Sequence, residues 1–394
     1  MTHAVIVSTA RTPLAKSWKG SFNMTHGATL GGHAVQHAVA IDRVCWQGEA
    51  VAAIVAETRR QAEDALDHVV VEWEVLPAVT DMRDSLSNRY VIHPDLGDNT
   101  CFSRELVTAG FEEAFATADV VVETTYDFSR HTGVTNEPRG LLADYNPADH
   151  TLVVYHGTQA PHMMQDIFSR HLNIPESNVR VVCKDVGGSF GIKVHAYPDD
   201  FATVALSMMC RRPVKFVADR LESFTSDIHA RHHRVTARIG VKKSGEIVGF
   251  EMDDLTGIGP FSMFPRTSAI EGNQVVNLVG GPYKHQNYRA HLKVVFQNKT
   301  PTCQYRGVGH PIACAVTEGL VDLAARKIGM DPLEFRKRNV IPDDAYPATG
   351  ASGIKLEVLS HEACLRKIEQ IMDYPALLAE QKALRERGIY RGIG

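Results

Sequence analysis

The sequence contains no pair of cysteines separated by two residues, and its seven cysteines are scattered along the chain: Cys45, Cys101, Cys183, Cys210, Cys303, Cys314 and Cys364. This excludes a disulfide framework, a zinc finger and a self-contained iron–sulfur site, and it favours a cytoplasmic protein in a reducing environment. No apolar run approaches the roughly 18 residues of a transmembrane helix, so no membrane span is expected. With Lys+Arg 42 and Asp+Glu 46, the net charge of −4 excludes electrostatic binding of nucleic acid.

Acidic residues are missing from the first 40 positions, which carry Arg11, Lys16 and Lys19. A transit peptide can have such a composition, and this alternative stays open. The pattern favours a folded start, because residues 4–7 are typical of a short buried strand and residues 27–40 of a helix. A secretory signal is not expected, since no continuous apolar stretch follows a basic one.

Within these 40 residues, AVIVSTARTP and GATLGGHAVQHAVA resemble the first strand and first helix of the thiolase family, the acetyl-CoA acetyltransferases. That family needs a nucleophilic cysteine at a helix N-terminus, and the context of Cys101, the nearest candidate, does not match. No catalytic residue is therefore assigned from this resemblance. His33 and His37 have a metal-ligand spacing, but Ala34 stands where a zinc-protease helix needs Glu, which favours histidines without a metal.

The whole chain of 394 residues is long enough for two or three domains of about 150 residues. Periodicity predicts strands at 51–56, 69–75, 118–128, 152–156, 179–182, 214–218, 234–240 and 246–253, with a hairpin between the last two, and helices at 58–66, 161–172, 199–210, 314–328 and 332–339. Thr58 is expected to cap the first of these helices. Such a mixture predicts an α+β or mixed α/β fold.

Three polar or glycine-rich stretches carry the candidate chemistry. Residues 185–193 (DVGGSFGIK) follow a strand, and their glycines let a backbone approach an anionic ligand, although a plain glycine turn fits the spacing as well. Gln159 leaves a strand just before a helix, where a structural amide is the alternative to a ligand contact. Arg306 precedes another helix in QYRGVGHP, where it either binds an anion or forms a surface ion pair.

Together these stretches resemble the molybdopterin-binding large subunit of the molybdenum hydroxylases, the family of xanthine dehydrogenase, aldehyde oxidase and aerobic carbon monoxide dehydrogenase. Residues 47–81 resemble its hammerhead α/β domain. NEPRG (136–140), GTQAPH (157–162), VGGSFGIK (186–193), YRGVGHP (305–311) and DPLEFRKRN (331–339) follow in the family's order. The earlier resemblance assigns residues 1–40 to a thiolase-like segment, and a polar composition with Pro and Gly predicts a linker at 83–110. The second resemblance implies a partial hammerhead domain at 41–82 and an incomplete first molybdenum-cofactor-binding domain at 111–394.

The resemblance also implies roles for individual residues. Gln159 would hydrogen-bond an oxo ligand of molybdenum, and Arg306 and Gly307 would lie beside the metal and the substrate. The residues expected to line the face of the metal are Gly188, Ser189, Phe190 and Gly191. None of these side chains would ligate the metal directly. Gly307 stands where carbon monoxide-oxidising members have a copper-binding Cys, so no copper site is expected, and His310 stands where the family often has Arg.

The family reaction is hydroxylation of an electron-poor carbon, as in an aldehyde or N-heterocycle, with water as the oxygen source. The expected cofactor is molybdenum–molybdopterin, in its cytosine dinucleotide form, and the expected partners are an FAD-binding medium subunit and a 2Fe–2S small subunit. The family's base is a Glu that no residue here matches, since Glu137 and Glu318 lie elsewhere in the pattern. No catalytic residue is therefore assigned.

The join near residue 40 and the end at Gly394 suggest a fused or truncated gene product with half of a cofactor site. Such a chain is expected to bind molybdopterin weakly, if at all, and to be inactive alone. Three alternatives stay open: a thiolase-type acyltransferase, a non-catalytic assembly partner, and an unstable fragment.

Overall fold

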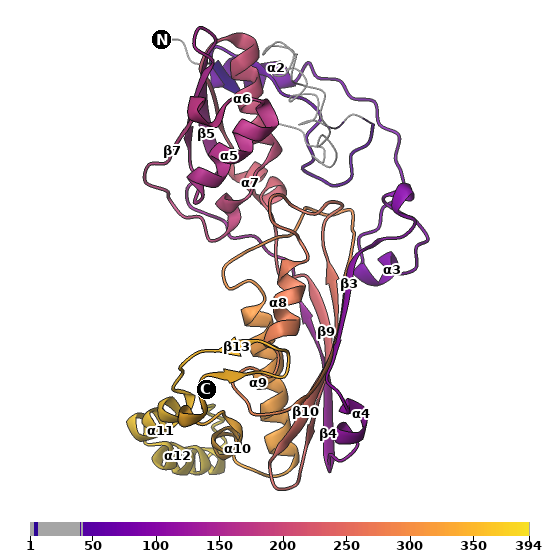
Figure 1. Ribbon diagram of the computed structural model, residues 1–394, viewed down its shortest axis with the longest axis vertical. Helices are drawn as coiled ribbons and strands as arrows, with labels where there is room; N and C mark the ends of the chain where they lie inside the picture. The colour runs from indigo at the N-terminus through magenta and orange to yellow at the C-terminus, as the bar shows by residue number, and fades with distance from the viewer. Residues whose placement is uncertain (1–3, 7–39, 41, 394) are drawn as a thin grey trace.

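A computed structural model describes residues 4–6, 40 and 42–393. Within these residues the chain forms two lobes joined by a narrow waist, one above and one below in Figure 1. Each lobe has its own sheet and its own apolar core. This is the mixed α/β fold expected from the sequence. The helix predicted at 27–40, the pair His33 and His37, and most of the thiolase-like segment lie outside the described residues.

The upper lobe contains a six-stranded sheet in the order β2-β1-β8-β5-β6-β7. Its elements are β1 (Ala4–Ile6), β2 (Val55–Ala56), α2 (Arg59–Leu66), β5 (Gly140–Asn146), β6 (Thr151–His156), α5 (Pro161–Leu172), η2 (Glu176–Asn178), β7 (Val179–Val182), η3 (Ile192–Val194), α6 (Pro198–Cys210), β8 (Val214–Val217) and α7 (Arg220–Ser226). Helices α5 and α6 pack on the sheet through Met164, Phe168 and Phe201.

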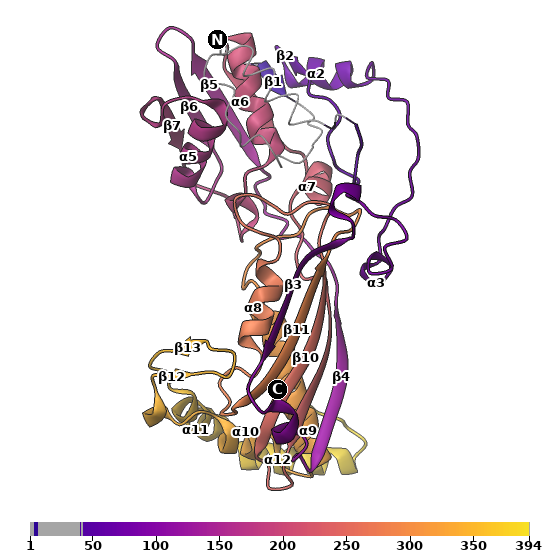
Figure 2. The same ribbon diagram turned by 45° about the vertical axis from the view of Figure 1, so that its right-hand side comes forward.

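The lower lobe contains a long five-stranded sheet in the order β3-β11-β10-β9-β4. Figure 2 shows its edge strands β3 and β4 on either side of the sheet. Its elements are α3 (Met82–Ser85), η1 (Pro94–Leu96), β3 (Thr100–Val107), α4 (Phe111–Phe115), β4 (Val120–Phe128), β9 (His233–Val241), β10 (Ile247–Gly257), α8 (Ile270–Leu278), β11 (Asn287–Val295) and α9 (His310–Lys327).

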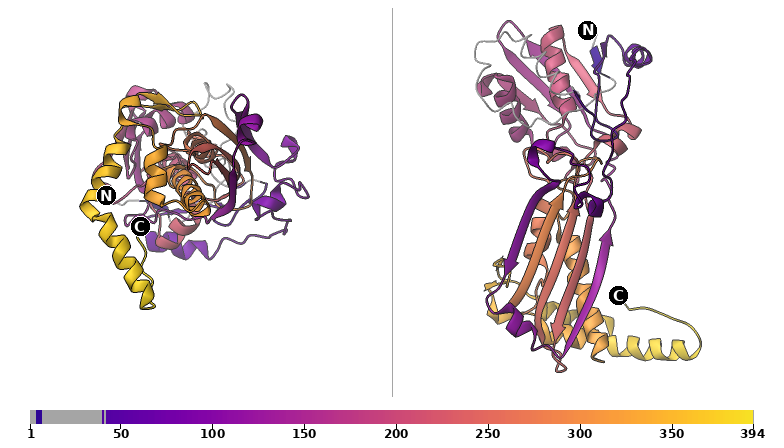
Figure 3. Two further views of the ribbon diagram at one scale, coloured as in Figure 1. Left: turned by 90° about the horizontal axis from the view of Figure 1, so that it is seen from below. Right: turned by 90° about the vertical axis from the view of Figure 1, so that its right-hand side faces the viewer.

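Beyond α9 the chain forms α10 (Pro332–Asn339), η4 (Asp343–Ala345), the small hairpin β12 (Ala348–Thr349) and β13 (Lys355–Leu356), α11 (His361–Met372) and α12 (Tyr374–Glu386). Figure 3 shows α12 projecting from the lower end of the molecule. No helix of the described chain combines the length and the apolar character needed to cross a bilayer.

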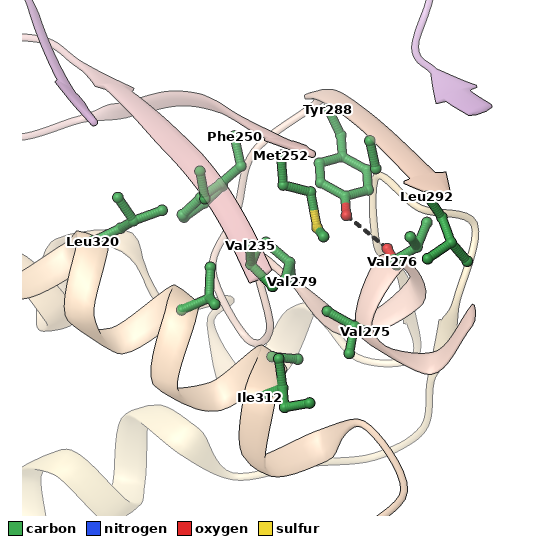
Figure 4. Close-up of a cluster of buried hydrophobic side chains, with 14 of the residues drawn as sticks. Val235, Phe250, Met252, Val275, Val276, Val279, Tyr288, Leu292, Ile312 and Leu320 are labelled. Atoms are coloured by element: carbon green, nitrogen blue, oxygen red, sulfur yellow. Dashed lines mark hydrogen bonds between the residues drawn. The ribbon is translucent and has the colours of Figure 1, made fainter. Parts of the chain in front are cut away.

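The core of the lower lobe lies between its sheet and helices α8 and α9. Side chains of β9 alternate, so that Val235, Ala237 and Ile239 are buried on the face toward the helices. Figure 4 shows this layer, in which the Tyr288 hydroxyl donates to the carbonyl of Val276 on α8 over 2.7 Å. The bond satisfies the one polar atom of a fully buried ring.

Most predicted elements are confirmed, including α5, β7 and α10 at their predicted bounds and the β9–β10 hairpin. The Thr58 cap is confirmed, since its hydroxyl oxygen accepts from the Gln61 amide at 3.3 Å. The strand predicted at 69–75 is wrong. That segment has no ladder partner among the described residues and leaves Val70 87% and Val75 91% exposed, because an alternating pattern makes a strand only beside another strand.

The region expected to be a linker, 83–110, contains β3, an edge strand paired with β11. None of the residues of β3 is fully buried, so the strand carries only a faint apolar pattern in the sequence. The strand expected at 51–56 is shortened to Val55–Ala56, which joins the upper sheet through β1.

Candidate functional site

Gln159 lies in the loop between β6 and α5, and its side chain binds the glycine-rich loop 187–191. These two loops and the turn at 306–309 are called the waist site below. Its Oε1 accepts a hydrogen bond from the Gly191 amide at 3.1 Å and another from the Ser189 hydroxyl. Its own amide, like the Thr158 hydroxyl, donates to the carbonyl of Lys193, at 3.1 and 2.9 Å. No described residue accepts a hydrogen bond from the Gln159 Nε2, so this donor is available to a ligand.

The loop 187–191 has a backbone that depends on its glycines. Gly188 and Gly191 have φ angles of +99° and +101°, and a Cβ at Gly191 would lie 2.7 Å from the carbonyl oxygen of Gln304. Phe190 adopts φ +54°, the left-handed region that costs a residue with a side chain about 1 to 2 kcal/mol. The three positive φ angles at Gly188, Phe190 and Gly191 show that the loop has a sharply turned backbone that depends on its glycines.

Arg306 lies against this loop from the other side of the waist. Its amide donates to the Phe190 carbonyl at 2.9 Å, and its guanidinium carbon lies 4.1 Å from the centre of the Phe190 ring. The side chain is exposed and forms no ion pair with any described carboxylate. The surface ion pair considered above is therefore not what holds it, and its charge is open to an anion.

The turn that carries Arg306 continues through residues 307–309 into α9. Gly307, Val308 and Gly309 have φ angles of +88°, +25° and +80° in succession. His310 begins the helix, with its Nδ1 2.6 Å from the carbonyl oxygen of Gly307. The structure thus brings all seven predicted cofactor-binding residues into adjoining loops at one place.

Glu137, from NEPRG, closes the glycine-rich loop at both ends. Its Oε2 accepts from the Gly187 amide at 2.8 Å and from the buried Lys193 ammonium at 2.5 Å. Burial raises the pKa of Glu137, but the hydrogen bonds from Lys193 and Gly187 outweigh this and leave the pKa below its usual value. Its carboxylate is therefore ionised and engaged, which agrees with its not being assigned as a base.

Arg139, two residues further on, ties the waist together from within. Its guanidinium is buried, bonds Asp199 and Asp227 at 2.5 Å each, and lies 3.8 Å from the centre of the Tyr197 ring. Such a pair, once buried, is costly to break by removing one partner.

A buried chain of charges lies behind the 306–309 turn, formed by Arg231, Glu271, His233 and Asp254. Sequence reasoning missed these four residues. The available signal was that His233 and Asp254 occupy helix-facing positions of strands that otherwise bury apolar side chains, and buried charges of this kind accompany functional sites.

A hollow of about 740 Å³ lies elsewhere, beside residues 42–47 and 71–79, and shares no residue with the site at the waist. Its walls include Trp46, Trp73 and Tyr90. No group of three or more metal-ligating side chains occurs within the described residues.

The donors at the waist fit an oxygen-rich, anionic group. The Gln159 Nε2 and the Arg306 guanidinium are both uncommitted donors. The glycines at 187, 188 and 191 let the loop pack closely against Glu137, the Phe190 ring and the Gln304 backbone, which fixes its position beside these donors. A family profile described as the molybdopterin cofactor-binding domain matches residues 92–340, which include every one of these residues.

The chain belongs to the molybdopterin cofactor-binding domain family. It is 33% identical to the nicotine 6-hydroxylase large subunit of Paenarthrobacter nicotinovorans, over 90% of this chain and 44% of that protein. It is 30% identical to the nicotinate dehydrogenase large molybdopterin subunit of Eubacterium barkeri, over 78% of this chain and 71% of that protein. The crystal structure of quinoline 2-oxidoreductase from Pseudomonas putida 86 superposes with a TM-score of 0.83 at 30% identity, covering 87% of this chain and 44% of that one.

The chain spans a little less than half the length of most of the relatives it matches. These relatives confirm the family expected from the sequence and give the acyltransferase alternative no support.

Proposed function

We propose that this chain forms the molybdopterin-binding face of a molybdenum hydroxylase that acts on an aldehyde or an N-heterocycle. The observation that carries the proposal is the meeting of Gln159, the 187–191 loop and Arg306 at the waist, with two donors left uncommitted. When bound, the molybdenum cofactor would supply the redox chemistry that hydroxylates an electron-poor carbon with oxygen from water.

The residues of the chain would bind and orient that cofactor. The Gln159 Nε2 would donate a hydrogen bond to an oxygen of the group, and the Arg306 charge would offset its negative charge. Gly188, Ser189 and Gly191 would bring the backbone close, and the Phe190 ring would keep water from this side while it holds the guanidinium in place. Gly307 would leave space beside Arg306 for a small substrate.

The finer parts of the proposal rest on the family. They are the cytosine dinucleotide form of the cofactor, FAD-binding and 2Fe–2S partner subunits, a cytoplasmic location and a division of the chain at residues 41, 83 and 111. The relatives named above include large subunits of nicotine 6-hydroxylase and nicotinate dehydrogenase, which supports an N-heterocyclic substrate over an aldehyde.

Equilibrium dialysis of the purified chain against molybdenum cofactor released from a donor enzyme tests the proposal, with molybdenum and pterin fluorescence measured on both sides of the membrane. We expect weak, saturable binding that Arg306→Ala weakens about 10-fold, since a charge-assisted hydrogen bond is worth about 1.5 to 3 kcal/mol. Arg326→Ala is the matched control, because Arg326 is an exposed arginine paired with Asp322. No saturable binding, or equal binding by the Arg306 variant, would contradict the proposal.

A further inference from the structure

Four charged side chains behind the 306–309 turn form a continuous buried chain of alternating sign. They come from different elements: Asp254 from β10, His233 from the start of β9, Glu271 from the first turn of α8, and Arg231 from the segment before β9. Their side chains are between 0% and 7% exposed. The arrangement is neutral as a whole, with two carboxylates, one guanidinium and one imidazolium.

At the inner end of this row of charged side chains, an imidazolium lies between two carboxylates. The His233 Nδ1 lies 2.9 and 3.0 Å from the two carboxylate oxygens of Asp254, and its Nε2 lies 3.6 Å from the Glu271 Oε2. Burial lowers the pKa of His233, but Asp254 and Glu271 overcome this and raise the pKa to about 10. His233 is therefore charged at neutral pH and holds the Glu271 carboxylate from one side.

At the outer end of this row of charged side chains, Glu271 and Arg231 form hydrogen bonds to the 306–309 turn. The Glu271 carboxylate accepts from the Arg231 amide at 2.9 Å, from the Arg231 guanidinium, and from the Gly309 amide at 3.3 Å. The Arg231 guanidinium also donates to the carbonyl of Arg306. One end of the turn is thus bonded to Arg231 and the other to Glu271.

This turn needs such support, because three successive residues with positive φ form no regular structure of their own. Apolar packing would stabilise the sheet end at least as well as buried charges, since buried ion pairs gain little over apolar residues of equal volume. Charges with directional hydrogen bonds are instead suited to fixing one backbone geometry.

We propose that Glu271 and Arg231 are positioning residues that hold the 306–309 turn so that Arg306 faces the Phe190 loop, with His233 and Asp254 orienting Glu271. The use of the turn for cofactor binding rests on the proposed function, whereas its positioning by these residues does not.

Hydrogen exchange of the ligand-free chain tests the positioning, with protection factors corrected for intrinsic exchange at each pH. We expect Glu271→Gln to lower the protection of the Gly309 amide at least 10-fold and to leave α5 and β6 within 2-fold of the wild type. Arg231→Lys keeps the charge but loses the forked geometry, and we expect a smaller loss at the same amide. This second variant keeps the test open if Glu271→Gln does not fold.

The pH dependence of the Gly309 protection distinguishes positioning that depends on the charge of His233 from positioning by packing alone. The ionisable groups that face His233 or its carboxylate partners are Asp254, Glu271, Arg231, the neighbouring His232, Cys303 beside Glu271 and, beside Asp254, Tyr288 of β11. In the wild type we expect the Gly309 protection to stay constant from pH 6 to 9. In Asp254→Asn, with one carboxylate lost, we expect protection to fall across the same range as His233 loses its proton.

The matched control is Asp253→Asn, which removes the neighbouring carboxylate of the same strand. Asp253 is 68% exposed and lies 3.5 Å from the surface residue His291, and we expect its variant to match the wild type. Gly309 protection within 2-fold of the wild type in both Glu271→Gln and Arg231→Lys would overturn the positioning proposal. An equal loss of protection in α5 and β6 would also overturn it. The exchange experiment uses the chain without cofactor, so a negative result contradicts only the positioning proposal. A negative dialysis result contradicts the proposed function.

Discussion

The guanidinium of Arg306 lies over the ring of Phe190, 4.1 Å from its centre, and the amide of Arg306 donates to the carbonyl of Phe190. These residues are 116 positions apart and belong to different loops, one after β7 and one before α9. Their contact joins the two glycine-rich turns into a single surface, and the account of this chain as a cofactor-binding face depends on it.

The left-handed backbone of Phe190 gives a first prediction. Phe190→Ala and Phe190→Gly both remove the ring, but only glycine adopts φ +54° without steric cost. We therefore expect the glycine variant to be more stable than the alanine variant by about 1 kcal/mol in urea unfolding. Equal stability of the two variants would show that the backbone at this position is relaxed.

The close approach at Gly191 gives a second prediction. Gly191→Ala must both adopt a positive φ and place a Cβ 2.7 Å from the Gln304 carbonyl oxygen, whereas Gly329 has φ +74° with open space around its Cβ. We expect Gly191→Ala to lower the free energy of unfolding by about 1 kcal/mol or more beyond the effect of Gly329→Ala. Similar losses in the two variants would place the Gln304 backbone further from the loop.

The buried Arg139 network gives a third prediction. Arg139→Ala leaves Asp199 and Asp227 buried without their cation, and we expect a loss of about 3 to 5 kcal/mol in the free energy of unfolding. Arg170→Ala removes an exposed arginine paired with Asp166 within α5, and we expect a change of at most about 0.5 kcal/mol. Chemical unfolding of both variants measures the difference, and a loss below that of Arg170→Ala would contradict the role assigned to Arg139.

The ionisation of His233 gives a fourth prediction. Its pKa of about 10 in the folded chain lies above the ordinary value of 6.5, so its stabilisation is complete below pH 6.5 and is lost as the pH rises through 10. We expect the free energy of unfolding to fall between pH 7 and 10 by about 1 kcal/mol or more beyond the fall in His233→Gln, which lacks this group. Parallel pH curves for the two proteins would show that His233 does not titrate in this range.

The sequence predicted the elements whose periodicity is strong and local. Helix α5 begins at Pro161, and β9 alternates between buried and half-buried residues before a glycine turn leads into β10, so these elements could be predicted from local residues. Residues 69–75 alternate equally well but form no strand, because strand formation depends on a neighbour that the pattern does not encode. Strand β3 was missed for the converse reason, since its pairing with β11 compensates for a weak pattern.

In the candidate site too, residues in local motifs could be predicted, whereas residues that depend on distant partners could not. Gln159, Phe190 and Arg306 were predicted because they lie in glycine-rich motifs whose order resembles a known family. Glu271 and Arg231 carry no local motif, and their pairing across 40 residues arises only because the first turn of α8 lies beside the segment before β9. A buried ion pair between residues this far apart is evident from the fold and not from the sequence.

A crystal structure of the chain soaked with molybdenum cofactor tests the central claim most directly, since anomalous scattering locates the metal without ambiguity. The account predicts one molybdenum peak at the waist, beside the 187–191 loop, with the Gln159 Nε2 and the Arg306 guanidinium in contact with the cofactor. A peak in the hollow beside Trp46 and Trp73, with the waist loops unliganded, would contradict it.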